Sequence, residues 1–197
     1  MGALSLTADT SIDDARLNGT STFSMQDVVI PGVGNIALAM DISLHSLDAE
    51  SLGVIAAALR EVQDEDNQEA ALQAIYPQIE GDVQKLISSG AEIDINQFDL
   101  RLPQGKLSTS LQVKFAEMDK DADFSWSSVL LTMTASMNMR IPIALYELVK
   151  SMNPEAEALV AMGVLKRSGD DYVMDAEYAQ GLLNVNGAPM PIPMPAM

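Results

Sequence analysis

The chain of 197 residues contains no cysteine, a single histidine and a single tryptophan. Without cysteine it has no disulfide framework, no thiol nucleophile and no cysteine-based zinc site. The one histidine, His45, cannot by itself supply a catalytic triad or a multi-histidine metal site. Because it falls on the polar side of an alternating segment, we expect His45 to face solvent rather than to act as a general base.

Motifs that bind phosphate or activate a nucleophile are also missing. There is no glycine-rich phosphate loop, no G-x-S-x-G elbow and no H-E-x-x-H pair. The 13 methionines, among them Met190, Met194 and Met197 near the end, raise Cu(I) binding as an alternative. Their place in apolar patterns and in a proline-rich tail favours packing instead. We therefore expect a protein that is not an enzyme and that uses no cofactor or metal.

Basic residues are scarce: 11 lysines and arginines stand against 28 acidic residues, and the net charge is −17. Acidic side chains spread over most segments favour solubility and repel other polyanions, so we expect no nucleic-acid partner. No apolar run reaches the roughly 18 residues that a membrane-spanning helix needs. We therefore expect no part of this sequence to span a membrane as a helix.

Two-residue alternation of apolar and polar residues, typical of half-buried strands, recurs along the chain. A change of its phase near Asn96 and Gln97 predicts a β-bulge that keeps the apolar residues of that strand on one face. The residues "PQG" at 103–105 predict a hairpin turn. The strands are expected at 4–8, 16–29, 36–44, 93–102, 107–115, 131–141, 164–166, 172–178 and 183–185.

A period of three to four residues replaces this alternation in two segments. It predicts an amphipathic helix over 49–63, capped by Asp48 or Ser51, and a second helix over 67–88. Pro77 is expected to kink or split the second helix, because proline removes a backbone donor and crowds the preceding turn.

The strand expected over 131–141 has the most regular pattern, and its apolar face includes Met133, Met137 and Met139. Two interpretations stay open for this face. The helices of the same chain can cover it as an ordinary core. Alternatively, unbranched and polarizable methionine side chains can line a site for a lipid-like, acyl-chain ligand.

These elements predict one domain over 1–197 with an α+β fold. Persistent alternation indicates a long, curved, mostly antiparallel sheet, since parallel sheets are buried on both faces. Further short helices are expected after Pro142 and after Asn153. All helices are expected to pack on one face of the sheet, its concave side, where their apolar stripes meet the apolar residues of the strands.

The C-terminal stretch "DDYVMDAEYAQGLLNVNGAPMPIP" resembles the end of the YdgA-like family of bacterial envelope proteins, a family of unknown function. The matching residues include Gly181, Asn186, Gly187 and Pro189, and Asn186-Gly187 suits a tight type I′ turn. The motif is structural and carries no catalytic residue. The resemblance implies that the chain is the C-terminal part of a longer, periplasmic protein of a Gram-negative bacterium, anchored to the inner membrane.

Together these features favour a non-enzymatic envelope domain that acts as a binding or scaffolding module. The expected contact is a sheet edge, or the open end of the curved sheet, that binds a protein partner or another copy of the chain. The alternative is a carrier of a lipid-like ligand held between sheet and helices.

Overall fold

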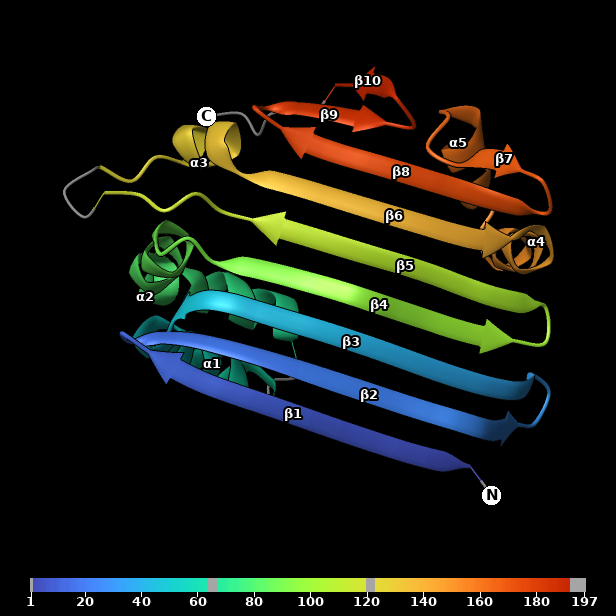
Figure 1. Cartoon of the computed structure of the whole chain (residues 1–197), viewed down its shortest axis with the longest axis horizontal. Coiled ribbons are helices and arrows are strands. Elements are labelled where there is room, and N and C mark those ends of the chain that lie inside the picture. The colour runs from blue at the N-terminus through green and yellow to red at the C-terminus, as the bar shows by residue number, and fades with distance from the viewer. Residues whose placement is uncertain (1, 64–66, 120–122, 192–197) are drawn as a thin grey trace.

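An open sheet of ten strands dominates the part of the chain that the structure describes (Figure 1). The computed structural model describes residues 2–63, 67–119 and 123–191, so Met194 and Met197 lie outside the described residues. The strands are β1 (Ala3–Asp13), β2 (Arg16–Ile30), β3 (Gly34–Asp48), β4 (Glu92–Leu102), β5 (Gly105–Lys114), β6 (Thr134–Pro142), β7 (Lys166–Ser168), β8 (Asp171–Ala179), β9 (Leu182–Val185) and β10 (Ala188–Met190).

Every pairing between these strands is antiparallel. The order across the sheet is β1-β2-β3-β4-β5-β6-β8-β9-β10, and β7 pairs with β8. Most neighbours in the sheet therefore follow one another in the chain, as hairpin connections allow. The predicted bulge is present, because the registers of β4 with both neighbouring strands shift around Asn96 and Gln97.

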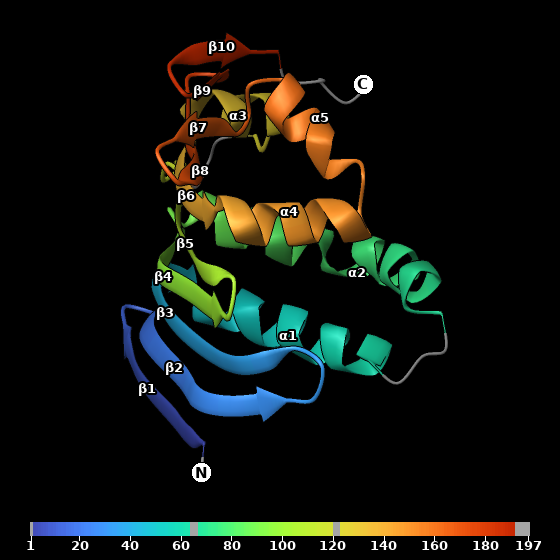
Figure 2. The same cartoon turned by 90° about the vertical axis from the view of Figure 1, so that its right-hand side faces the viewer.

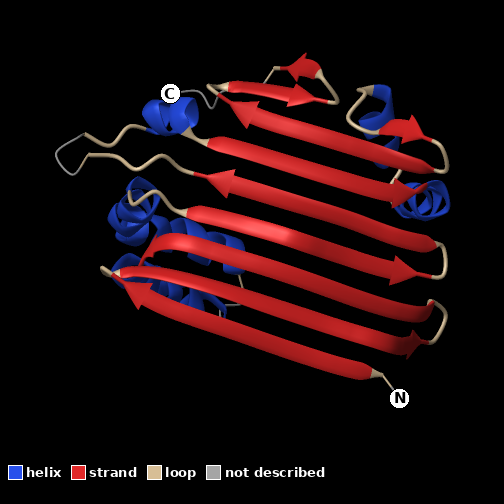
Figure 3. Cartoon of the chain, viewed as in Figure 1, coloured by secondary structure: helices blue, strands red, loops and turns tan. Residues whose placement is uncertain are grey.

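The helices of the described chain lie on one side of the sheet, the concave side seen in Figure 2. Figure 3 shows how they are inserted between groups of strands. The predicted α+β class is confirmed. The helices are α1 (Ala49–Gln63), α2 (Gln68–Ser88), α3 (Trp126–Thr132), α4 (Ile143–Met152) and α5 (Ala156–Ala161).

The two long helices begin and end where the pattern predicts. Asp48 Oδ1 accepts a hydrogen bond of 2.9 Å from the Ser51 backbone N–H and so caps α1. Of the two effects expected of Pro77, a split does not occur, since α2 runs through this residue as one element. Ile75 and Ile79 are both buried on either side of Pro77, and their packing holds the two halves together.

The prediction of a strand over 131–141 is wrong at its beginning. Leu131 belongs to α3, Met133 is the residue after that helix, and β6 starts at Thr134. Tertiary contacts stabilise this short helix: Val129 is 4% exposed, and the Tyr178 hydroxyl donates a hydrogen bond of 2.6 Å to the Leu130 carbonyl. Such contacts act across the sheet and override a local two-residue pattern.

Two further boundaries differ from prediction. The helix expected to start directly after Asn153 begins at Ala156, because the Asn153 side chain accepts a hydrogen bond from the Glu155 N–H within a turn. The strand expected at 164–166 is β7, which starts at Lys166. The preceding residue, Leu165, is 6% exposed and packs into the core instead.

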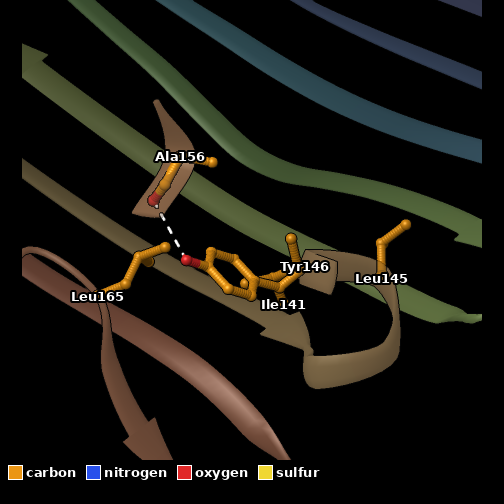
Figure 4. Packing of buried hydrophobic residues seen from close by; sticks show 5 residues of the cluster. All are labelled: Ile141, Leu145, Tyr146, Ala156 and Leu165. Carbon is orange, nitrogen blue, oxygen red and sulfur yellow. Dashed lines mark hydrogen bonds between the residues drawn. The ribbon is translucent and has the colours of Figure 1, made fainter. Parts of the chain in front are cut away.

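A cluster of buried apolar residues lies where α4 and α5 pack on one end of the sheet (Figure 4). Tyr146 is 3% exposed and donates a hydrogen bond of 3.2 Å to the Ala156 carbonyl. Its ring lies 4.4 Å from that of Tyr172, centroid to centroid, and burial raises the pKa of the Tyr146 hydroxyl. The buried members of this core are Ile141, Leu145, Tyr146, Ala156 and Leu165.

Candidate functional site

The strand β1 forms an open edge of the sheet (Figure 1). It pairs with β2 through all eleven residues without a register shift, from Ala3 opposite Gln26 to Asp13 opposite Arg16. Within the described residues no strand pairs with its other side, and every residue of β1 is exposed. Half of the peptide groups of an edge strand point away from its neighbour. β1 therefore presents a long row of unpaired backbone donors and acceptors.

Apolar residues of β1 continue as rows across the concave face. Directly opposed residues of antiparallel strands point to the same face, so the pairing registers define these rows. The helices cover this face, because Met139 and Met174 pack against the core beneath α4 and α5. One row contains Leu6, Phe23, Met40, Phe98, Thr109, Met139 and Met174, and the next contains Ala8, Ser21, Ile42, Ile95, Leu111, Met137, Ala176 and Val185.

Helical cover of these rows decreases toward β1. Phe98 on β4 and Phe23 on β2, the neighbour of β1, are half-buried. Leu4, Leu6 and Ile12 on β1 keep 70%, 68% and 66% of their surface exposed. Each such side chain gains about 1.5–3 kcal/mol when it is fully buried. The apolar strip of β1 together with its free backbone edge is the candidate binding site.

The opposite edge of the sheet is protected. It consists of β9, β10 and β7, which pairs with β8 beside β9, and these strands contain only four, three and three residues. Pro189 lies in the middle of β10 and has no backbone N–H to offer a further strand. β1 contains no proline and no lysine, two residues that natural edge strands use to prevent pairing. The two edges of the sheet are therefore built differently, and among the edge strands that the structure describes β1 is the one suited to strand addition.

The three methionines expected to line an apolar site lie in two elements. Met137 and Met139 are half-buried on β6 and point to the concave face, beside Leu111 and Met174. Met133 follows the end of α3, outside the strand. The structure thus brings Met137 and Met139 together in neighbouring rows and places Met133 apart from those rows.

The other face of the sheet is polar and carries an open hollow of about 580 Å³. Its lining includes Asp99, Lys106 and Arg140, and Lys106 Nζ lies 2.7 Å from Asp99 Oδ2. Burial raises the pKa of Asp99, but hydrogen bonds from Lys106, Gln97 and Ser108 outweigh burial and hold this pKa below its ordinary value. The charges of Asp99 and Lys106 are thus paired, as is usual on a solvated sheet face.

His45 lies on this polar face, as predicted, and its side chain is 45% exposed. Its Nε2 lies 3.8 Å from Asp94 Oδ2. Asp94 is 8% exposed and its Oδ1 has no hydrogen-bond partner in the described structure. The pair is thus a partly exposed histidine beside a buried carboxylate, and the Ser43 hydroxyl, two residues before His45, accepts a hydrogen bond of 2.7 Å from Asn96.

In the part of the chain that the structure describes, no group of three or more His, Asp and Glu side chains could hold a metal ion. None of the helices within 2–63, 67–119 and 123–191 combines the length and apolar character needed to cross a membrane.

A family model for bacterial proteins of unknown function, DUF945, matches residues 1–193. The chain belongs to this family. A search of curated proteins and a search of solved structures gave no match. DUF945 membership thus confirms a bacterial family of unknown function and supplies no catalytic residue.

The C-terminal motif of this DUF945 chain is structural, as its residue types predict. Gln180-Gly181 and Asn186-Gly187 form the two-residue turns of successive hairpins, β8–β9 and β9–β10, and all four residues have positive φ. For Asn186 and Gly187 the φ angles are 53° and 76°. Positive φ at both turn positions is the mark of a type I′ turn, which favours asparagine and glycine.

Asn186 has a second role that sequence reasoning missed. Its side-chain N–H groups donate to the Gly163 and Val164 carbonyls at 2.9 and 3.0 Å. Its side-chain oxygen accepts from the Asp175 N–H at 3.0 Å. One turn residue therefore ties β8 to the loop between α5 and β7. Only the asparagine itself signals such bonding, since its partners are distant in the sequence.

Proposed function

We propose that this DUF945 domain is a non-enzymatic binding or scaffolding module that holds a protein partner along β1. The observation that carries the proposal is the eleven-residue edge strand, exposed at every position and regular in its pairing with β2. A partner strand added there gains backbone hydrogen bonds and covers the apolar strip of Leu4, Leu6 and Ile12.

The bacterial envelope is the proposed location. The resemblance of the C-terminal motif to YdgA-like proteins supports a periplasmic domain within a longer, membrane-anchored protein. The absence of cysteine agrees with this location, because no thiol is exposed to an oxidising compartment.

Site-specific photocrosslinking in living cells tests the proposal. A benzophenone amino acid replaces Leu6, whose side chain is 68% exposed on β1. The matched control places the same group at Leu182, which is 64% exposed on β9 at the protected edge. We expect one discrete crosslinked protein from position 6 that is absent from position 182. A Thr7→Pro change, which removes a backbone donor of β1, should abolish the adduct.

Two results would contradict edge binding. One is the absence of any protein adduct at position 6 in cells that express the folded protein. The other is the same adduct at both positions, since it would reflect random collision rather than a site.

A carrier of a lipid-like ligand is the second candidate. It is favoured by the half-buried state of Met137, Met139 and Phe98, which leaves apolar surface beneath the helices incompletely packed. Native mass spectrometry of protein from an envelope fraction distinguishes this candidate. A near-stoichiometric acyl species that is lost in a folded Met137→Lys variant would support it, and ligand-free protein would refute it.

A further inference from the structure

The regularity of β1 makes it complementary to itself. The pairings of β2 with β3, β3 with β4 and β4 with β5 all contain register shifts, whereas β1 pairs with β2 without any. A strand without bulge or proline can be paired along its whole length. Two such edges can therefore meet over all eleven residues, Ala3–Asp13.

We propose that two copies of this chain pair antiparallel through β1, around a twofold axis at Ala8, so that their sheets become one continuous sheet. This inference rests on the proposed function, because it names the partner of the same edge. Antiparallel pairing about such an axis keeps both concave faces, and thus both sets of helices, on the same side.

The sequence of β1 selects one register. When opposed residue numbers add up to 16, Leu4 faces Ile12 of the second copy, Leu6 faces Thr10, and Ala8 faces Ala8. The apolar strips of the two copies then adjoin on the concave face. All eleven residues are paired, and an antiparallel pair of this length forms about ten backbone hydrogen bonds.

Neighbouring registers are worse. A slip of one residue would oppose apolar positions with polar ones, because side chains alternate between faces. When the numbers of opposed residues add up to 14 instead, Ile12 has no partner within β1 of the second copy. When they add up to 18, Asp9 lies directly opposite Asp9 of the second copy, and like charges in direct opposition destabilise a strand pair.

Charge opposes this dimer from a distance rather than at the interface. In the proposed register Asp9 faces Thr7 and Asp13 faces Ala3, so no two carboxylates are directly opposed. Each copy still carries a net charge of −17. Repulsion between exposed charges is screened over about 8 Å at physiological ionic strength. Added salt should therefore strengthen this dimer, whereas it would weaken one held by ion pairs across the interface.

Single cysteines provide the test, since the natural chain has none. An Ala8→Cys variant places two thiols opposite each other at about 4.5–5.5 Å between Cα atoms, which a disulfide can span. Thr7→Cys is the matched control one residue away. Its two thiols would be offset by two residues along the strands, beyond the roughly 7 Å limit for a disulfide.

The expected result is oxidation of Ala8→Cys to a covalent dimer at least about tenfold faster than Thr7→Cys. A mixture of Leu6→Cys and Thr10→Cys chains should give the mixed dimer in preference to either homodimer. Sedimentation of the natural chain should show dimer formation that increases with salt. A Leu6→Lys variant with an unchanged unfolding midpoint should stay monomeric.

Equal rates for Ala8→Cys and Thr7→Cys would overturn the register, and a monomer at every salt and protein concentration would overturn the dimer. If the purified chain is monomeric while Leu6 crosslinks to a different protein in cells, the second copy is excluded and edge binding remains. If neither a dimer nor a crosslink forms, the proposed function fails as well.

Discussion

At the scale of single residues, Asn186 connects the most parts of the C-terminal region. It occupies a positive-φ turn position, and its side chain bonds three backbone groups from two other segments. The Lys166 ammonium adds a hydrogen bond of 3.0 Å to the Asn186 carbonyl. The turn conformation and the side-chain bonds are separate contributions to stability, and different substitutions remove each of them.

We expect Asn186→Gly to lower the free energy of unfolding by about 2–3 kcal/mol, because it removes the side-chain hydrogen bonds and leaves the Gly163 and Val164 carbonyls to find other partners. Asn186→Ala should cost about 1 kcal/mol more, since alanine also resists positive φ. Urea unfolding measures both values. Gln180→Gly is the control, because Gln180 has a φ of 54° in the other type I′ turn. Equal loss in Asn186→Gly and Gln180→Gly would contradict a bonding role for Asn186.

Much of the residue-level pattern was readable from the sequence. The alternating phase placed His45 on the polar face, and the Asn-Gly pair identified the last turn. The partner of His45 was not readable, because Asp94 is brought beside it by strand pairing across 49 residues of chain, from β3 to β4. The Asn186 contacts were missed for the same reason.

At the scale of elements, local signals predicted long helices well and short ones poorly. α1 and α2 have apolar stripes and caps within their own sequence. α3 has seven residues, and no side-chain hydrogen bond caps its start at Ser125. It depends on the burial of Val129 and on the Tyr178 hydroxyl. A helix this short is not stable by itself, so its position could not follow from its own residues.

Ion pairs connect the start of α1 with the last turn of α2. Lys85 Nζ lies 3.2 Å from Asp48 Oδ1 and 2.9 Å from Glu50 Oε2. Burial raises the pKa of Asp48, but hydrogen bonds from Ser51 and Lys85 outweigh burial, and the net pKa is below its ordinary value. The stability that Asp48 contributes is therefore complete above about pH 5 and is lost as the pH falls through the lowered pKa.

Asp48→Asn should reduce this acid sensitivity. Asparagine still caps the helix, so we expect a loss of less than about 1 kcal/mol at neutral pH. Between about pH 5 and pH 2 the free energy of unfolding should fall less steeply than in the natural protein. Urea unfolding over a pH series measures this slope, with exposed Asp123→Asn as a control for loss of charge. An unchanged slope would mean that Asp48 does not stabilise the helix pair.

At the scale of the whole molecule, one edge of the sheet is protected against strand addition and the other edge, β1, is free to pair. The alternation of the strands predicted an antiparallel sheet with one apolar face, and that prediction is confirmed. It also suggested that helices cover this face, yet cover decreases from Ile141, at 7% exposure, to Leu6, at 68%. Periodicity shows which face is apolar but not how far the helices extend over it.

Residue-resolved amide hydrogen exchange of the dilute protein tests the open edge most directly. If β1 pairs on one side only, every second amide between Ala3 and Asp13 should exchange rapidly while its neighbours are protected by β2. At high concentration and high salt, the rapid amides should become protected as well. Uniform protection of β1 in the dilute monomer would show that its edge is already occupied, and uniformly rapid exchange would show that β1 is detached. Either result would contradict an edge that is free to bind.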